Sequence, residues 1–171
     1  MQLPYLEIFM FRIIHDIIKL EVNMRISSRC VLIENDKILL IYREKNGKVY
    51  YVFPGGGVGE AETNEECLIR ECREELGIEI NIIKQLYEVK GKDFLQHFFL
   101  IERVSGDIGT GDAWEYDVNR VGGLQRPMFI NINELDKLDV VSRDIVEQLL
   151  SDYKKYGSNL GDEVVTIDED K

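Results

Sequence analysis

The chain has 171 residues, a length that suits one domain with a substantial buried core. Its formal charge of −11 argues against sequence-independent nucleic-acid binding, because such proteins present a basic face to the phosphates. The 3 cysteines lack a Cys-x-x-Cys spacing and there are only 2 histidines, so a zinc or histidine-based metal site is not indicated. Cys30, Cys67 and Cys72 are predicted to be buried, reduced thiols.

Residues 1–23 are interpreted as an N-terminal extension that forms an amphipathic helix. Charged residues interrupt any run long enough to span a membrane, and neither a basic start nor a small-residue cleavage site indicates a secretory signal. Three alternatives stay open: a helix docked on the domain or on the partner in a homodimer, a helix on a membrane surface, or a start upstream of a core protein beginning at Met24. We favour docking or an extended start, and we predict a cytoplasmic protein.

From residue 26 the pattern is typical of strands separated by turns. Glu34-Asn35-Asp36 and Asn46-Gly47 are turn signals between β-rich runs, so a hairpin and a following strand are expected. The predicted strands are residues 29–33, 37–42, 49–53, 79–89, 94–104 and 127–132.

Two helices interrupt and follow these strands. Thr63 and Glu66 have the spacing of a capping box, and Gly77 suits a left-handed helix end. Ser142 is predicted to cap a second helix that continues to about Tyr156. Strands that flank one helix and precede another predict an α/β/α sandwich around a central mixed sheet. We assign the domain to residues 24–157, with an acidic, frayed tail at 158–171.

Three carboxylates, those of Glu71, Glu74 and Glu75, share one face near the end of the first helix. Like charges at this spacing cost roughly 0.2–0.5 kcal/mol per pair, and carboxylates in a last turn also oppose the helix dipole. The two interpretations are a solvated acidic face and a cluster of oxygen ligands for Mg²⁺ or a similar divalent cation.

A wider constellation favours the metal site. The pattern is Gly56, five residues, Glu62, seven residues, then Arg70-Glu71-Cys72-Arg73-Glu74-Glu75-Leu76-Gly77-Ile78. It resembles the signature of the Nudix hydrolases, and the resemblance covers residues 25–155. Two residues before Glu62 depart from many members: Gly59 stands in place of a glutamate and Ala61 in place of a glycine.

The resemblance implies a hydrolase that cleaves a diphosphate bond in a nucleoside diphosphate linked to another group. It implies Glu71, Glu74, Glu75 and the Gly55 carbonyl as ligands of Mg²⁺, or alternatively Mn²⁺. Glu62, Arg70 and Gly56 would support the site structurally. The general base would be Glu71 or the more distant Glu115, which lies in the long glycine-rich loop at 105–126. Glu74→Gln is then expected to abolish Mg²⁺-dependent turnover without unfolding the protein.

The substrate is less clearly indicated. Arg43 could reach a phosphate, and Phe53 and Phe98 could stack on a base, although surface and core roles are the competing interpretations. Lys92-Asp93-Phe94-Leu95 is typical of neither the ADP-ribose nor the diadenosine polyphosphate subfamily, so a nucleoside triphosphate pyrophosphohydrolase is the default. A non-catalytic Nudix-fold nucleotide-binding or regulatory module and a prenyl diphosphate isomerase are alternatives. Neither explains the complete set of signature carboxylates.

Overall fold

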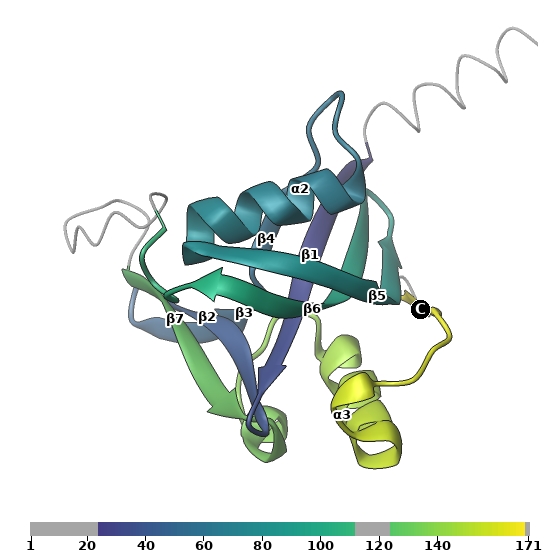
Figure 1. Cartoon of the computed structure of the whole chain (residues 1–171). Coiled ribbons are helices and arrows are strands. Elements are labelled where there is room, and N and C mark those ends of the chain that lie inside the picture. The colour runs from purple at the N-terminus through teal and green to yellow at the C-terminus, as the bar shows by residue number, and fades with distance from the viewer. Residues whose placement is uncertain (1–23, 112–123, 170–171) are drawn as a thin grey trace, which may run out of the picture.

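The computed structural model of the protein describes residues 24–111 and 124–169. An eight-stranded sheet runs through the domain in the order β3-β2-β1-β6-β5-β8, with β4 paired to β1 and β7 paired to β2 (Figure 1). β1 and β6 are parallel, as are β5 and β8, and the other pairs are antiparallel. The strands are β1 (Arg25–Glu34), β2 (Lys37–Lys45), β3 (Lys48–Val52), β4 (Gly55–Gly57), β5 (Ile78–Gly91), β6 (Phe94–Gly106), β7 (Leu124–Asn131) and β8 (Val165–Asp168).

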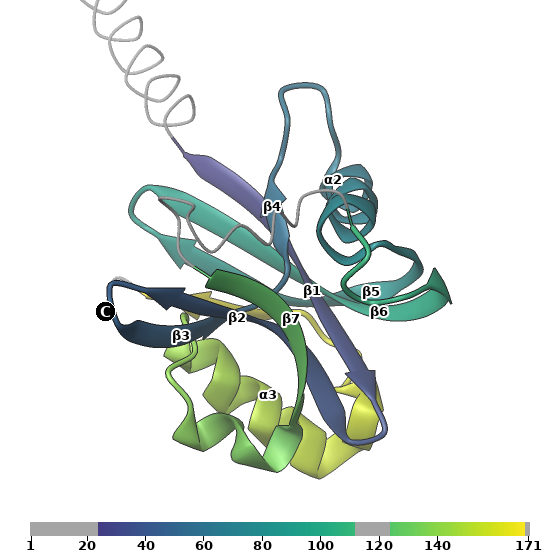
Figure 2. The same cartoon turned by 90° about the vertical axis from the view of Figure 1, so that its left-hand side faces the viewer.

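Helices cover both faces of this sheet (Figures 1 and 2). On one face lies α2 (Asn64–Glu71), which continues into a π-helical turn, η1 (Cys72–Leu76), and buries Leu68 among the strand side chains. On the other face lies α3 (Arg143–Tyr156), which buries Ile145 and Leu149 in a second core. Two short 3₁₀ helices, η2 (Ile132–Lys137) and η3 (Gly157–Asn159), flank α3. The predicted α/β/α sandwich with a mixed sheet is confirmed.

The predicted turns are present. Asn35 and Asp36 have φ of 50° and 59°, and Asn46 and Gly47 have φ of 53° and 74°. Two consecutive residues with positive φ match the right-handed twist of a β-hairpin, which is why asparagine, aspartate and glycine occur there. All three cysteines are free and buried, as expected.

β1 and β2 pair only next to their connecting turn, at Ile33–Ile38 and Glu34–Lys37. Beyond that point β1 follows β6 and β4, whereas β2 follows β3 and β7, so the two strands diverge (Figure 2). The divergence places Arg29 of β1 and Arg43 of β2 on two separating arms of the sheet.

Two expectations about the C-terminal third are wrong. Ser142 precedes α3, but its side chain makes no capping hydrogen bond. Its φ of 67° is left-handed, whereas a capping side chain needs an extended backbone to reach the first-turn N–H groups. The tail is also not frayed, because Leu160 is buried and β8 pairs in parallel with β5.

The N-terminal extension at 1–23 lies outside the described residues. Among the described residues, no helix is long and apolar enough to span a membrane.

Candidate active site

The glycine-rich strand β4 brings the chain back onto β1 and leads it toward α2. Arg29 is in register with Gly55, and Ser28 with Gly56. Gly55 has φ of 127°, and a Cβ on it would lie 2.1 Å from the Ser28 carbonyl oxygen. Only glycine fits there, because the backbone conformation and the neighbouring strand both exclude a side chain.

Gly55→Ala is expected to destabilise the protein by at least about 3 kcal/mol, since backbone strain of 1–3 kcal/mol adds to a clash with strand backbone. Gly47→Ala is the control: its φ is 74° but open space surrounds it, so about 1 kcal/mol is expected. Chemical denaturation measures both variants. Equal losses of stability in the two variants would mean that close packing around Gly55 does not exclude a side chain there.

The helix that follows begins as the sequence indicates. Thr63 Oγ1 accepts from the Glu66 N–H at 3.1 Å, and Glu66 Oε2 accepts from the Thr63 N–H at 2.9 Å, which completes the capping box. Its end differs, because residues from Cys72 to Leu76 form a π-helical turn before Gly77 with φ of 74°. Wider turns of this kind rotate the side chains that follow and are frequent at functional sites.

The π-helical turn separates the environments of the three carboxylates. Glu74 keeps 51% of its side-chain surface exposed, whereas Glu71 keeps 14%. Glu75 points inward, and its Oε2 accepts from the Gly55 N–H at 2.9 Å. A Cβ on Gly56 would lie 2.1 Å from Glu71 Oε1, so Gly56 leaves the room that this carboxylate needs. Burial raises the pKa of Glu75, and the Gly55 N–H opposes that shift.

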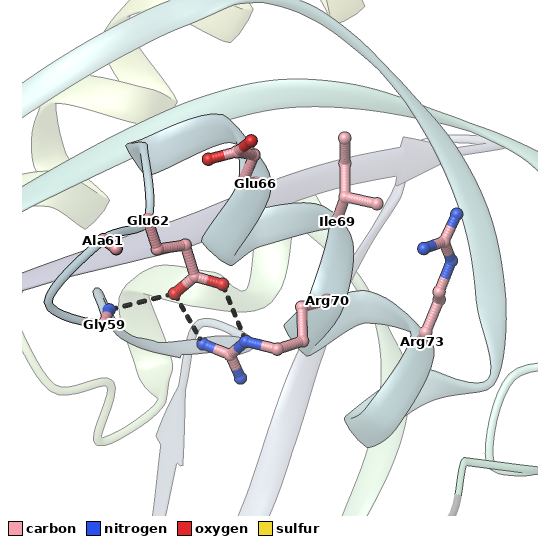
Figure 3. A pocket seen from close by; sticks show the side chains of 7 residues that line it. All are labelled: Gly59, Ala61, Glu62, Glu66, Ile69, Arg70 and Arg73. Atoms are coloured by element: carbon pink, nitrogen blue, oxygen red, sulfur yellow. Dashed lines mark hydrogen bonds and ion pairs between the residues drawn. The ribbon is translucent and has the colours of Figure 1, made fainter.

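Glu62 and Arg70 join the loop to the helix (Figure 3). Arg70 donates from Nε to Glu62 Oε1 at 2.8 Å and from Nη2 to Glu62 Oε2 at 3.0 Å. Its Nη1 also reaches Glu71 at 2.7 Å and Glu74 at 3.1 Å. The unusual Ala61 does not prevent this pairing, because the Glu62 N–H donates to the Gly59 carbonyl and the Gly59 N–H donates to Glu62 Oε2.

These bonds predict how stability depends on pH. The Arg70 guanidinium and the Gly59 N–H lower the pKa of Glu62 to about 2, from a usual 4.5. A carboxyl with a lowered folded-state pKa stabilises the fold fully above its unfolded pKa and loses that contribution as pH falls toward the folded value. Glu62→Gln should therefore melt below wild type at neutral pH, and the difference should shrink between about pH 4.5 and 2. Thermal unfolding across pH tests this; a constant difference would contradict it.

Two arginines approach the same carboxylates from the strands. Arg29 Nη1 donates to the Gly55 carbonyl oxygen at 2.6 Å. Arg29 and Arg43 both oppose the raised pKa of Glu75 electrostatically, so both positive charges lie near this carboxylate. The Arg43 Nε is buried and has no hydrogen-bond partner among the described residues. Arg43 was singled out from the sequence, but Arg29 was missed; its signal is a lone charge within the otherwise apolar or small-residue run 26–33.

Phe53 and Phe98 do not form an exposed stacking surface. They are 3% and 1% exposed, and their rings meet edge to face with centroids 5.2 Å apart. Aromatic pairs of this kind stabilise cores. The structure therefore gives both residues a packing role and does not support contact with a base.

The donor chemistry of the site fits a divalent cation. The Gly55 carbonyl and the carboxylates of Glu71, Glu74 and Glu75 are hard oxygen donors of the kind that Mg²⁺ takes. Each of these four groups already accepts a hydrogen bond, and for three of them the donor is a guanidinium. With these contacts in place, residues 24–111 and 124–169 contain no group of three or more acidic, histidine or cysteine side chains close enough together to hold a metal ion.

A hollow of about 710 Å³ lies beside this site on the outer side of α2 (Figure 3). It shares Glu62 and Arg70 with the network above, but none of the three clustered carboxylates lines it. Arg73 also lines the hollow and is paired with Glu79 at 2.7 Å. We therefore assign no chemistry to this surface.

Glu115 lies outside the described residues. The chain enters its loop beside the site, since a Cβ on Gly111 would lie 2.2 Å from the Glu74 carbonyl oxygen.

The sequence is similar to those of known proteins. The sequence model of a family described as NUDIX domain matches residues 24–149. The ADP-ribose pyrophosphatase of Methanocaldococcus jannaschii is 29% identical over 133 residues, which cover 73% of this chain and 70% of that protein. An uncharacterised Nudix hydrolase of Bacillus subtilis, YvcI, is 42% identical over 53 residues, 31% of this chain and 32% of that protein.

Solved structures share the fold. A Nudix hydrolase from Nitrosomonas europaea superposes with a TM-score of 0.62 at 18% identity, covering 86% of this chain and 80% of that one. An ADP-ribose pyrophosphatase from Streptococcus suis superposes with a TM-score of 0.57 at 16% identity, covering 83% and 98%.

Proposed function

The chain belongs to the Nudix domain family, and from that premise we propose that it is a metal-dependent pyrophosphohydrolase acting on a nucleoside diphosphate linked to another group. The observation that carries the proposal is the convergence of Glu71 and Glu75 on the Gly55–Gly56 strand, where Glu75 accepts from the Gly55 N–H and Glu71 lies against Gly56. Hydrolysis of a diphosphate bond needs charge neutralisation on the phosphate oxygens and an activated water, and a bound divalent metal supplies both.

The roles follow from the contacts. Glu71, Glu74, Glu75 and the Gly55 carbonyl would hold Mg²⁺ or Mn²⁺. Arg70 and Glu62 hold the loop against the helix and do not contact substrate in this proposal. The general base is Glu71 or Glu115. The entry of the chain into the loop beside Glu74 supports keeping Glu115 as a candidate.

Arg43 is the proposed phosphate contact. Within residues 24–111 and 124–169 its buried Nε lacks an acceptor, and a buried donor without a partner carries a substantial free-energy cost. A phosphate oxygen would satisfy it, and arginine suits phosphate because its planar donors match the oxygen geometry. Proximity to Glu75 supports placing that phosphate next to the carboxylates.

The sequence default and the relatives differ on the substrate. The default is a nucleoside triphosphate, whereas a relative that matches 73% of this chain is named ADP-ribose pyrophosphatase. We therefore propose ADP-ribose as the first compound to test and nucleoside triphosphates as the second.

A substrate panel tests the proposal. ADP-ribose, nucleoside triphosphates, diadenosine polyphosphates and CoA are incubated with Mg²⁺, and ³¹P NMR identifies which bond is cleaved. Turnover of at least one compound is expected, with chelation by EDTA abolishing it. Nucleotide binding without any turnover would instead support a non-catalytic module.

A further inference from the structure

The guanidinium of Arg29 already donates a hydrogen bond to the Gly55 carbonyl oxygen, which the proposed function assigns to the metal. Arg29 lies on β1 in register with Gly55 on β4, and its Nη1 donates to the Gly55 oxygen at 2.6 Å. The N–H of the same Gly55 donates to Glu75 at 2.9 Å. One glycine thus connects the arginine to Glu75, one of the clustered carboxylates, and the position of that glycine is set by strand pairing.

The surroundings make Arg29 the counter-charge of this site. Burial lowers the pKa of Arg29, and attraction to Glu75 opposes that shift. Burial likewise raises the pKa of Glu75, and Arg29 is among the groups that oppose it. Each group therefore reduces the cost of keeping the other charged away from water.

A divalent ion at the Gly55 carbonyl would meet this arginine directly. The Gly55 oxygen would be a ligand of the ion and a hydrogen-bond acceptor of the guanidinium. The ion and the guanidinium are both cations and would repel each other. Resting on the proposed function, we propose that Arg29 is a positioning residue that competes with the divalent metal for the Gly55 carbonyl and withdraws when the metal binds.

The structure provides a place for the withdrawn side chain. A cavity of about 50 Å³ adjoins Arg29 and is lined also by Val52, Phe53, Gln96, Val141 and Ser142. Gln96 and Ser142 carry polar groups that can accept from a guanidinium. A change of rotamer can therefore move the charge off the carbonyl without moving β1 or β4. Breaking the contact between Arg29 and the Gly55 carbonyl lowers the affinity for the metal. Before the metal binds, the same contact keeps a positive charge beside the carboxylates.

Metal titration of the full chain tests the proposal without relying on turnover. Mn²⁺ binding is followed by electron paramagnetic resonance for wild type, Arg29→Met, Arg29→Lys and Arg25→Met. A charge at 4–6 Å changes the proton affinity of a carboxylate by 1–3 pKa units, so Arg29→Met is expected to bind Mn²⁺ about tenfold more tightly. Arg29→Lys keeps the charge but not the planar donor fork, so its affinity should lie between those of wild type and Arg29→Met.

Arg25→Met is the matched control. Arg25 is on the same strand and also repels Arg29, but its residue is exposed and pairs with Phe94 rather than with Gly55. It removes the same charge and should change the dissociation constant less than about twofold, because exposed charges are screened. Thermal unfolding confirms that each variant is folded.

Three results would overturn the inference. The first is unchanged or weaker Mn²⁺ binding in folded Arg29→Met, and the second is an equal gain in Mn²⁺ affinity in Arg25→Met. The third is a wild-type Arg29 side chain whose environment does not change when metal binds. The last is read from the guanidinium ¹⁵N–¹H resonance of Arg29 during Mg²⁺ titration, which stays decisive if the methionine variant unfolds. A wild-type protein that binds Mn²⁺ with any of these results leaves the proposed function intact. No Mn²⁺ binding by wild type or variants would contradict the metal dependence itself.

Discussion

Glu75→Gln should lower Mg²⁺-dependent diphosphate hydrolysis by at least about 100-fold while the protein stays folded. A metal contributes several kcal/mol of charge stabilisation, and each 1.36 kcal/mol corresponds to about tenfold in rate. Glutamine keeps an oxygen that can still accept from the Gly55 N–H, so the contact between η1 and β4 survives. Steady-state kinetics of the substrate found in the panel, with thermal unfolding alongside, measure both effects.

Two further variants separate ligand loss from general charge loss. Glu74→Gln should also lose Mg²⁺-dependent turnover, although Glu74 is more exposed and contacts Arg70 only at 3.1 Å. Glu79→Gln removes an exposed carboxylate that pairs with Arg73, and it should keep near-normal turnover. Near-normal turnover in Glu75→Gln or Glu74→Gln would refute the metal assignment of that residue.

Arg70→Met should damage both folding and rate. The guanidinium binds Glu62, Glu71 and Glu74, and its loss leaves three carboxylates without their shared cation. Hydrogen bonds to charged groups contribute about 1.5–3 kcal/mol, and partial exposure of Arg70 reduces this to about 1–2 kcal/mol of unfolding free energy. Turnover should fall about 10- to 100-fold, as is usual when the groups that orient metal ligands are lost.

Arg73→Met is the control on the same helical segment. Its bond to Glu79 joins two largely exposed side chains, so removing it should cost less than about 1 kcal/mol and leave turnover unchanged. Denaturant unfolding and steady-state kinetics measure the pair of variants. Equal losses of stability in both would show that Arg70 is an ordinary surface arginine.

The local features of the fold were predictable because they depend on residues close together in the sequence. The capping box at Thr63 and Glu66 satisfies neighbouring N–H groups, and the turns at residues 35–36 and 46–47 need residues that accept positive φ. The tail was mispredicted for the opposite reason. Its acidic composition indicates solvent, whereas β8 is stabilised by an edge of β5 that lies some eighty residues earlier.

For the site, the sequence alone determined the identity of the clustered carboxylates and the glycines, because their spacing carries the family signature. Only the tertiary structure decided which donors meet them. Strand pairing brings Arg29 to the Gly55 carbonyl, and the π-helical turn leaves Glu74 exposed while Glu75 faces inward. The tertiary structure also decided that Phe53 and Phe98 are buried in the core. Spacing in the sequence specifies neighbours on one helix, whereas contacts between a strand and a helix depend on how the whole sheet closes.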